Sequence, residues 1–129
     1  MVLWEDFASA LGISPEDLRK RQGKPKTRQA LGVFKALMAD YGTGAAAMYA
    51  FEKPIPEIAS VKKEGLNNFY GINKPKDVQY FDVHATVDVE HAHFWSNELV
   101  AMGNEKAVMD ACMRSMDAQH MLLDACLEV

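Results

Sequence analysis

The sequence predicts an all-α fold, a bundle of about six helices joined by short connections. Apolar residues recur at intervals of three and four along most of the chain, and no segment shows the alternation of a half-buried strand. Glycine and proline stand at the ends of these periodic segments. With 129 residues, of which 49% are hydrophobic and 25% charged, the chain suits a single domain, residues 1–129, with a core of its own.

The N-terminal third is predicted to form two short helices and a longer one. Residues 4–11 are a periodic segment that ends at a glycine. The serine and proline that follow suit an N-cap and a first helical residue, for a helix over 14–22. A longer helix is expected from a cap at Thr27 to about Tyr41. Its spacing predicts one buried face, made of Ala30, Leu31, Phe34, Leu37, Met38 and Tyr41.

Small residues mark the next helix. Residues 42–44, Gly-Thr-Gly, are expected to interrupt the chain, and a helix over 45–53 follows. Its three successive alanines, Ala45–Ala47, allow another helix to approach closely. Two prolines end this helix and start the next, which is expected to run to about Tyr70 and to end at the glycine after it.

Two long helices complete the predicted bundle. The first spans roughly residues 77–101 and follows a loop over 73–76, and the second spans 105–127 after a Gly-Asn pair. Cys112 and Cys126 both lie in the second helix, about 21 Å apart along its axis. A disulfide needs Cα atoms within about 7 Å, so both cysteines are expected to be reduced.

Charge and hydropathy exclude several classes of function. The chain has 14 basic and 18 acidic residues, a net charge of −4, and no basic tract that would bind nucleic acid. No apolar run approaches the roughly 20 residues that cross a membrane. The first residues show no signal peptide, so we expect a cytoplasmic protein.

The helix over 77–101 carries the candidate chemistry. His84, Asp88 and His91 have the spacing i, i+4 and i+7, which places them on one face that we expect to point inward. Imidazole and carboxylate together suit iron, manganese or zinc. His84 and His91 are about 10.5 Å apart along the axis, long for one ion but suited to two ions about 3.5–4 Å apart. Asp88 and His91 would share one ion, and His84 would reach the other.

Such a site needs a carboxylate from elsewhere, and Glu52 is the best candidate. It is the single acid at the end of a strongly apolar segment, where a buried carboxylate would be costly unless paired or metal-bound. A solvated helix face is the alternative, because Glu90 and His93 lie on the same helix as the other candidates, and Glu52 could extend into water. The spacing alone leaves both interpretations open.

Several sequence blocks resemble a known family. They are residues 47–59 (AMYAFEKPIPEIA), followed by Lys62 and residues 65–71 (GLNNFYG), then 80–91 (YFDVHATVDVEH) and 3–13 (LWEDFASALGI). Together they are similar to TenA/PqqC-like proteins of the haem-oxygenase-like fold. Within that family the chain most resembles the metal-dependent branch that contains the death-domain-associating (CADD-type) proteins and related di-iron oxidases.

The resemblance implies an iron-dependent, dinuclear oxidase or oxygenase that uses dioxygen on a small organic substrate. Candidate reactions are the formation of para-aminobenzoate and the oxidative cleavage of fatty or amino acids. In that branch a glutamate on an earlier helix and a later His-x3-Asp-x2-His form part of the metal site. The resemblance therefore assigns Glu52, Asp88 and His91 to one ion and His84 to the other, with manganese as an alternative metal.

Two further residues match positions that resemble pocket positions in the CADD-type proteins. Lys62 and Tyr80 are the candidate catalytic residues that the resemblance implies, and a surface lysine and a loop-proximal tyrosine are the alternatives. Phe51 stands where the family often has a tyrosine, so a phenol beside the metal is absent at that position.

The chain resembles only the C-terminal part of the family domain. The family has further helices before the region of Trp4, and one of them supplies a Glu and a His to the first metal. We expect a longer sequence or a separate partner chain to supply these helices, or a homo-oligomer to cover the apolar face of residues 27–41 and the Ala45–Ala47 surface.

Other functions stay open on the same fold. A metal-free PqqC-like oxidase is disfavoured because few arginines lie near Asp88 and His91. A TenA-like hydrolase of thiamine derivatives is disfavoured because both cysteines lie in the final helix, where no base would support a nucleophile. A non-catalytic helical oligomer or interaction fragment is a third alternative.

Overall fold

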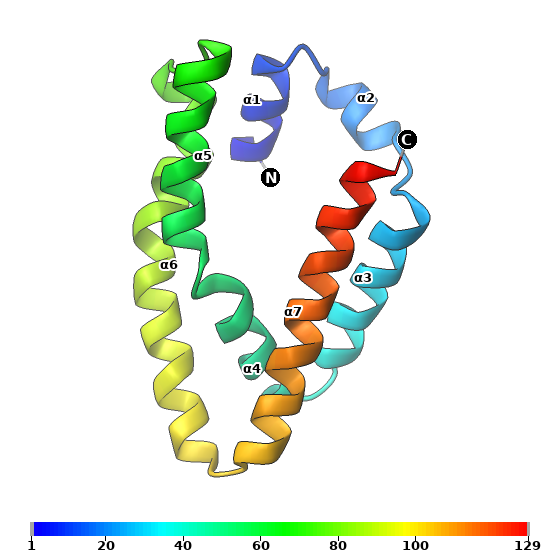
Figure 1. Cartoon of the computed structure of the whole chain (residues 1–129), viewed down its shortest axis with the longest axis vertical. Helices are drawn as coiled ribbons and strands as arrows, with labels where there is room; N and C mark the ends of the chain where they lie inside the picture. Colours follow the sequence, from blue (N-terminus) through cyan, green and yellow to red (C-terminus); the bar gives the residue numbers. More distant parts are fainter. Residues whose placement is uncertain (1, 129) are drawn as a thin grey trace. The chain divides into compact units, whose positions relative to one another are not determined.

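A computed structural model describes residues 2–128, which form seven α-helices and contain no strand (Figure 1). This confirms the all-α prediction, and each of the seven helices corresponds to a helical segment predicted from the sequence, although the overall count was put at about six. The helices are α1 (Val2–Ala10), α2 (Pro15–Lys20), α3 (Pro25–Leu37), α4 (Tyr41–Glu52), α5 (Ile55–Tyr70), α6 (Pro75–Met102) and α7 (Glu105–Leu127).

The helices belong to two compact units. Unit 1 contains α1, α2, α5 and the part of α6 up to Asp88, and unit 2 contains α3, α4, the rest of α6 from Val89, and α7. Each unit has a hydrophobic core of its own. The single domain predicted from the sequence stays a prediction.

The core of unit 1 is aromatic. Phe7 on α1 meets Phe81 on α6 edge to face, with ring centroids 5.0 Å apart, and Trp4 meets Tyr80 in the same way at 4.9 Å. Each such pair contributes about 0.5–1.5 kcal/mol beyond the area that it buries. Ala59 on α5 and Val78 on α6 complete this core. These contacts fix α1 against the first half of α6 and hold Tyr80 in place.

The core of unit 2 consists of small residues that bring α7 close to α4. Ala45–Ala47 are buried, and α7 packs against both α4 and α3. Ser115 Oγ donates to the Ala47 carbonyl oxygen at 2.9 Å, and Cys112 Sγ lies 3.3 Å from that of Ala46. Side chains of α7 thus reach the backbone of α4 directly. The predicted close approach of another helix to Ala45–Ala47 is confirmed. The expectation that these alanines would lie uncovered was wrong, because α7 covers them.

The structure corrects the start of α3 and of α4. Helix α3 begins at Pro25, so Thr27 lies inside it and is not its cap, and it ends at Leu37. Residues 42–44 do not interrupt the chain but form the first turn of α4. The Asp40 side chain accepts a hydrogen bond from the Thr43 backbone N–H at 3.0 Å and so caps the start of α4. This cap stabilises a first turn whose two glycines had indicated a break in the helix.

The predicted apolar face of residues 27–41 is only partly buried. Ala30 and Leu37 lie two turns apart on one line of α3, and both are buried in unit 2. Leu31 and Met38 lie beside that line and are exposed, as is Tyr41 at the start of α4. Helix α7, with a smaller contribution from α4, covers less of this face than the sequence pattern predicted.

Several predicted helix ends are confirmed. Ser14 caps α2 by accepting the Asp17 backbone N–H at 3.0 Å, and Gly12, Gly71 and Gly103 follow helices with positive φ angles. The loop expected over 73–76 is shorter, because α6 already begins at Pro75.

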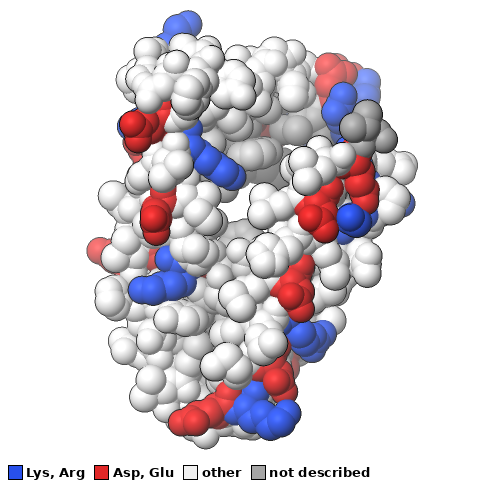
Figure 2. All heavy atoms as spheres, viewed as in Figure 1, with Lys and Arg blue, Asp and Glu red and all other residues white. Residues whose placement is uncertain are grey.

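The surface carries both signs of charge in each unit. On the face shown in Figure 2, lysine and arginine alternate with aspartate and glutamate. Among residues 2–128, no helix combines the length and the apolar character that crossing a membrane requires.

Candidate metal centre

Helix α6 presents three of the four predicted ligands. It is continuous from Pro75 to Met102, so its 3.6-residue period places His84, Asp88 and His91 along one side. Asp88 is only 4% exposed and His84 is partly buried, but the side chain of His91 is 50% exposed. The expected inward orientation therefore holds for Asp88 and holds only in part for His84 and for His91, whose ring is half-exposed although its Nδ1 lies near Glu52.

Glu52 joins two of these residues in a tight cluster. One donor atom each from Glu52, Asp88 and His91 lie within 4.8 Å of one another. Glu52 is the last residue of α4, and its Oε1 is 3.7 Å from His91 Nδ1. Two ligands that each lie about 2.1 Å from one ion are at most about 4.2 Å apart, so a small side-chain rotation suffices. The donor set fits one metal ion.

A tryptophan that sequence analysis did not identify holds the Glu52 carboxylate. Trp95 Nε1 donates a hydrogen bond to Glu52 Oε2 at 2.8 Å. Trp95 lies one turn after His91 and two turns after Asp88, so the helical spacing that identified the ligands also contained this residue. Only the tertiary structure shows that Glu52 is its partner.

His84 lies outside this cluster and has a defined tautomer. Its Nδ1 is 2.6 Å from the Tyr80 carbonyl oxygen, which can only accept, so Nδ1 carries the proton. The Nε2 lone pair is then the one that can bind a metal, which is a common arrangement of metal-binding histidines. The Tyr80 ring stacks on His84 with centroids 4.2 Å apart.

The two predicted catalytic residues differ in their surroundings. Burial, and secondarily the charge of Asp88, raises the pKa of the Tyr80 phenol, so this side chain is neutral at physiological pH. Lys62 is exposed on α5, and its neighbour Lys63 is the lysine that lines a groove of unit 1.

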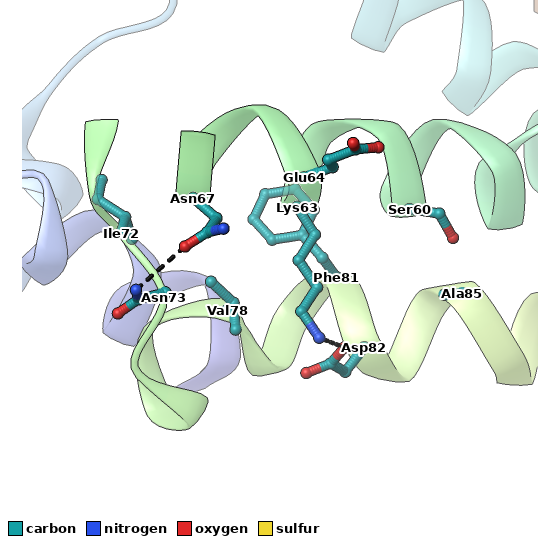
Figure 3. A pocket seen from close by; sticks show the side chains of 10 residues that line it. All are labelled: Ser60, Lys63, Glu64, Asn67, Ile72, Asn73, Val78, Phe81, Asp82 and Ala85. Atoms are coloured by element: carbon teal, nitrogen blue, oxygen red, sulfur yellow. Dashed lines mark hydrogen bonds and ion pairs between the residues drawn. The ribbon is translucent and has the colours of Figure 1, made fainter. Parts of the chain in front are cut away.

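That groove, between α5 and α6, has a volume of about 380 Å³ (Figure 3). Its floor is apolar and includes Val78 and Phe81. Its polar rim is internally paired, because Lys63 forms an ion pair with Asp82 and Asn73 donates a hydrogen bond to Asn67 at 3.0 Å. None of the predicted ligands lines it, so the metal centre is the stronger candidate site.

Comparison with known proteins gives the family. Residues 1–120 match the model of a family described as iron-containing redox enzymes. The chain belongs to this family. The match covers most of the sequence and confirms the resemblance to haem-oxygenase-like proteins that the sequence blocks indicated.

The similar curated proteins share one name. The chain is 36% identical over 128 residues to the 4-aminobenzoate synthase of Nitrosomonas europaea, a match that covers 95% of this chain and 52% of that protein. It is 31% identical over 129 residues to the 4-aminobenzoate synthase of Chlamydia trachomatis, covering 98% of this chain and 51% of that protein. A third, from Chlamydia muridarum, is 32% identical, with coverages of 98% and 50%. The chain thus spans about half the length of the curated relatives it matches.

Proposed function

We propose that this chain carries a metal centre of an iron-dependent, dinuclear oxidase whose reaction forms 4-aminobenzoate. The observation that supports this most directly is the convergence of Glu52, Asp88 and His91 from α4 and α6. Membership of an iron-containing redox family agrees with it, as does the name of the relatives.

In this proposal Glu52, Asp88 and His91 hold one ion, and His84 offers Nε2 to a second. Two carboxylates and an imidazole are ligands that suit iron, and also manganese. When bound, the metal supplies the redox chemistry with dioxygen. The remaining ligands of the second ion come from outside this chain, from a longer sequence, a partner chain or a second copy.

The chain's own residues contribute in other ways. The neutral Tyr80 phenol keeps its proton at Oη and can donate it as a hydrogen bond beside His84. Tyr80 also fixes the tautomer of His84 through its carbonyl oxygen. Lys62 is proposed as a further catalytic residue, since it matches a pocket position of the family.

A chimera tests the proposal. The half of the Nitrosomonas europaea protein that this chain matches is replaced by this chain, and the chimera is expressed in a bacterial strain that cannot make 4-aminobenzoate. We expect growth without added 4-aminobenzoate, and no growth with Asp88→Ala. The matched control is His93→Ala, which removes an exposed histidine of α6 outside the cluster and should leave growth unchanged.

A soluble, iron-loaded chimera that fails to restore growth would show that the 4-aminobenzoate reaction is wrong. A soluble chimera that purifies without iron would show instead that the metal centre is wrong.

A further inference from the structure

We propose that Trp95 is a positioning residue for the metal centre. Its indole N–H holds one carboxylate oxygen of Glu52, so that the other oxygen alone faces the ion. This inference rests on the metal centre proposed above and adds the residue that sets the orientation of one of its ligands.

The two oxygens of Glu52 have different partners. Oε2 accepts the hydrogen bond from Trp95 Nε1 at 2.8 Å, whereas Oε1 lies 3.7 Å from His91 Nδ1. Glu52 and Trp95 both belong to unit 2 and lie 43 residues apart in the sequence. The carboxylate is thus oriented by a contact between two helices rather than by its own helix.

The surroundings strengthen this contact. The Glu52 side chain is only 13% exposed, and Trp95 is partly buried with its ring packed edge-on against Phe94. A hydrogen bond to a charged acceptor is stronger than a neutral one, and it is weakened less by water where the groups are partly buried. The Glu52 carboxylate therefore has a strong preference for this orientation.

The chemistry of the indole ring means that Trp95 can orient a metal ligand but cannot be one. Indole Nε1–H is a donor only, so Trp95 cannot itself bind the ion. Outer hydrogen bonds of this kind orient ligating carboxylates, and losing one typically costs 10–100-fold in metal affinity. With Oε2 held by Trp95, Glu52 offers the ion a single oxygen.

The first test measures metal affinity. Mn(II) is titrated into the wild-type chain, Trp95→Phe and Trp4→Phe, and the unbound ion is followed by electron paramagnetic resonance. Trp4→Phe is the matched control, because it removes the other tryptophan, which packs against Phe7 and Tyr80 in unit 1. We expect Trp95→Phe to raise the Kd about tenfold or more, and Trp4→Phe to leave it unchanged.

Two results would overturn the proposal in different ways. A Kd for Trp95→Phe within twofold of that of the Trp4→Phe control removes the positioning role but leaves the metal centre intact. A wild-type chain that binds no Mn(II) removes the metal centre itself, and the positioning role with it.

A second measurement keeps Trp95 in place and so does not depend on how its variant folds. With ¹⁵N-labelled tryptophan, the chain gives two indole N–H resonances, and Trp4→Phe identifies that of Trp95. We expect Glu52→Gln to shift the Trp95 resonance, because a neutral amide is a weaker acceptor than a carboxylate. Mn(II) at less than one equivalent should broaden it. A resonance that is insensitive to both would show that Trp95 only fills space, and would refute the proposal.

Discussion

The packing of α4 on α7 determines where Glu52 lies, and Ala47→Leu tests this dependence. Ala47 is fully buried, and its carbonyl oxygen accepts the hydrogen bond from Ser115 at 2.9 Å. The neighbouring Ala46 is equally buried, with Cys112 Sγ at 3.3 Å from its carbonyl oxygen. A leucine at position 47 adds three carbon atoms where none fits, so α7 must move away from α4.

The cost has two parts. Overpacking a close-packed core typically costs about 1–3 kcal/mol. The lost hydrogen bond from Ser115 adds about 0.5–1.5 kcal/mol. We therefore expect Ala47→Leu to lower the free energy of unfolding by about 1.5–4.5 kcal/mol, out of the roughly 5–15 kcal/mol of an ordinary domain.

Urea denaturation followed by circular dichroism measures this loss, with Ala36→Leu as the control. Ala36 is exposed on α3, so the same substitution there should change stability by less than about 0.5 kcal/mol. Mn(II) affinity should also fall in Ala47→Leu, because Glu52 follows five residues later on the same helix. If the two variants were equally stable, the close packing of α4 on α7 would be refuted.

Two further predictions concern single side chains. In anaerobic titrations with Fe(II) or Mn(II), the wild-type chain should bind about one ion or less. Asp88→Ala and His91→Ala should abolish this binding, and His84→Ala should weaken it less. An equal loss of binding in all three variants would contradict the assignment of His84 to another ion. The hydrogen bond that Tyr41 donates to Glu98 at 2.6 Å raises the pKa of the Tyr41 phenol. This hydrogen bond therefore stabilises the folded chain fully at pH values below the phenol's unfolded pKa of about 10, and its contribution is lost as the pH rises through the folded pKa. Absorbance at 295 nm should show one of the four tyrosines ionising at lower pH in Glu98→Gln, and an unchanged titration would refute the link.

Helix α6 shows what the sequence predicts well. The prediction used only local features, namely the apolar period of the helix, the polar residues along it and the glycine after it. These features predicted both ends of the helix to within two residues of where they are observed. The spacing of Asp88 and His91 follows from the same period, so their shared face needed no knowledge of the rest of the chain. The family resemblance was likewise carried by contiguous blocks of sequence and is confirmed.

The errors arose where a neighbouring element decides the outcome. Residues 42–44 were predicted to break the helix because their glycines disfavour it, but the Asp40 cap holds them in the first turn of α4. Leu31 was predicted to be buried because of its spacing, but the contact with α7 is too narrow to cover it. The exposure of His91 depends on which helices cover α6. The partner of Trp95 depends on the placement of α4, which no local pattern specifies.

These observations predict how the ligands differ in their sensitivity to mutation. Asp88 and His91 are held by one continuous helix, so their spacing survives changes elsewhere. Glu52 depends on three contacts with three other helices. Phe51, beside it, packs edge-on against Phe34 of α3 with centroids 5.6 Å apart, Ala47 accepts from Ser115 of α7, and Glu52 itself accepts from Trp95 of α6. Substitutions in the core of unit 2 should therefore alter metal affinity through Glu52 before they disturb Asp88 or His91.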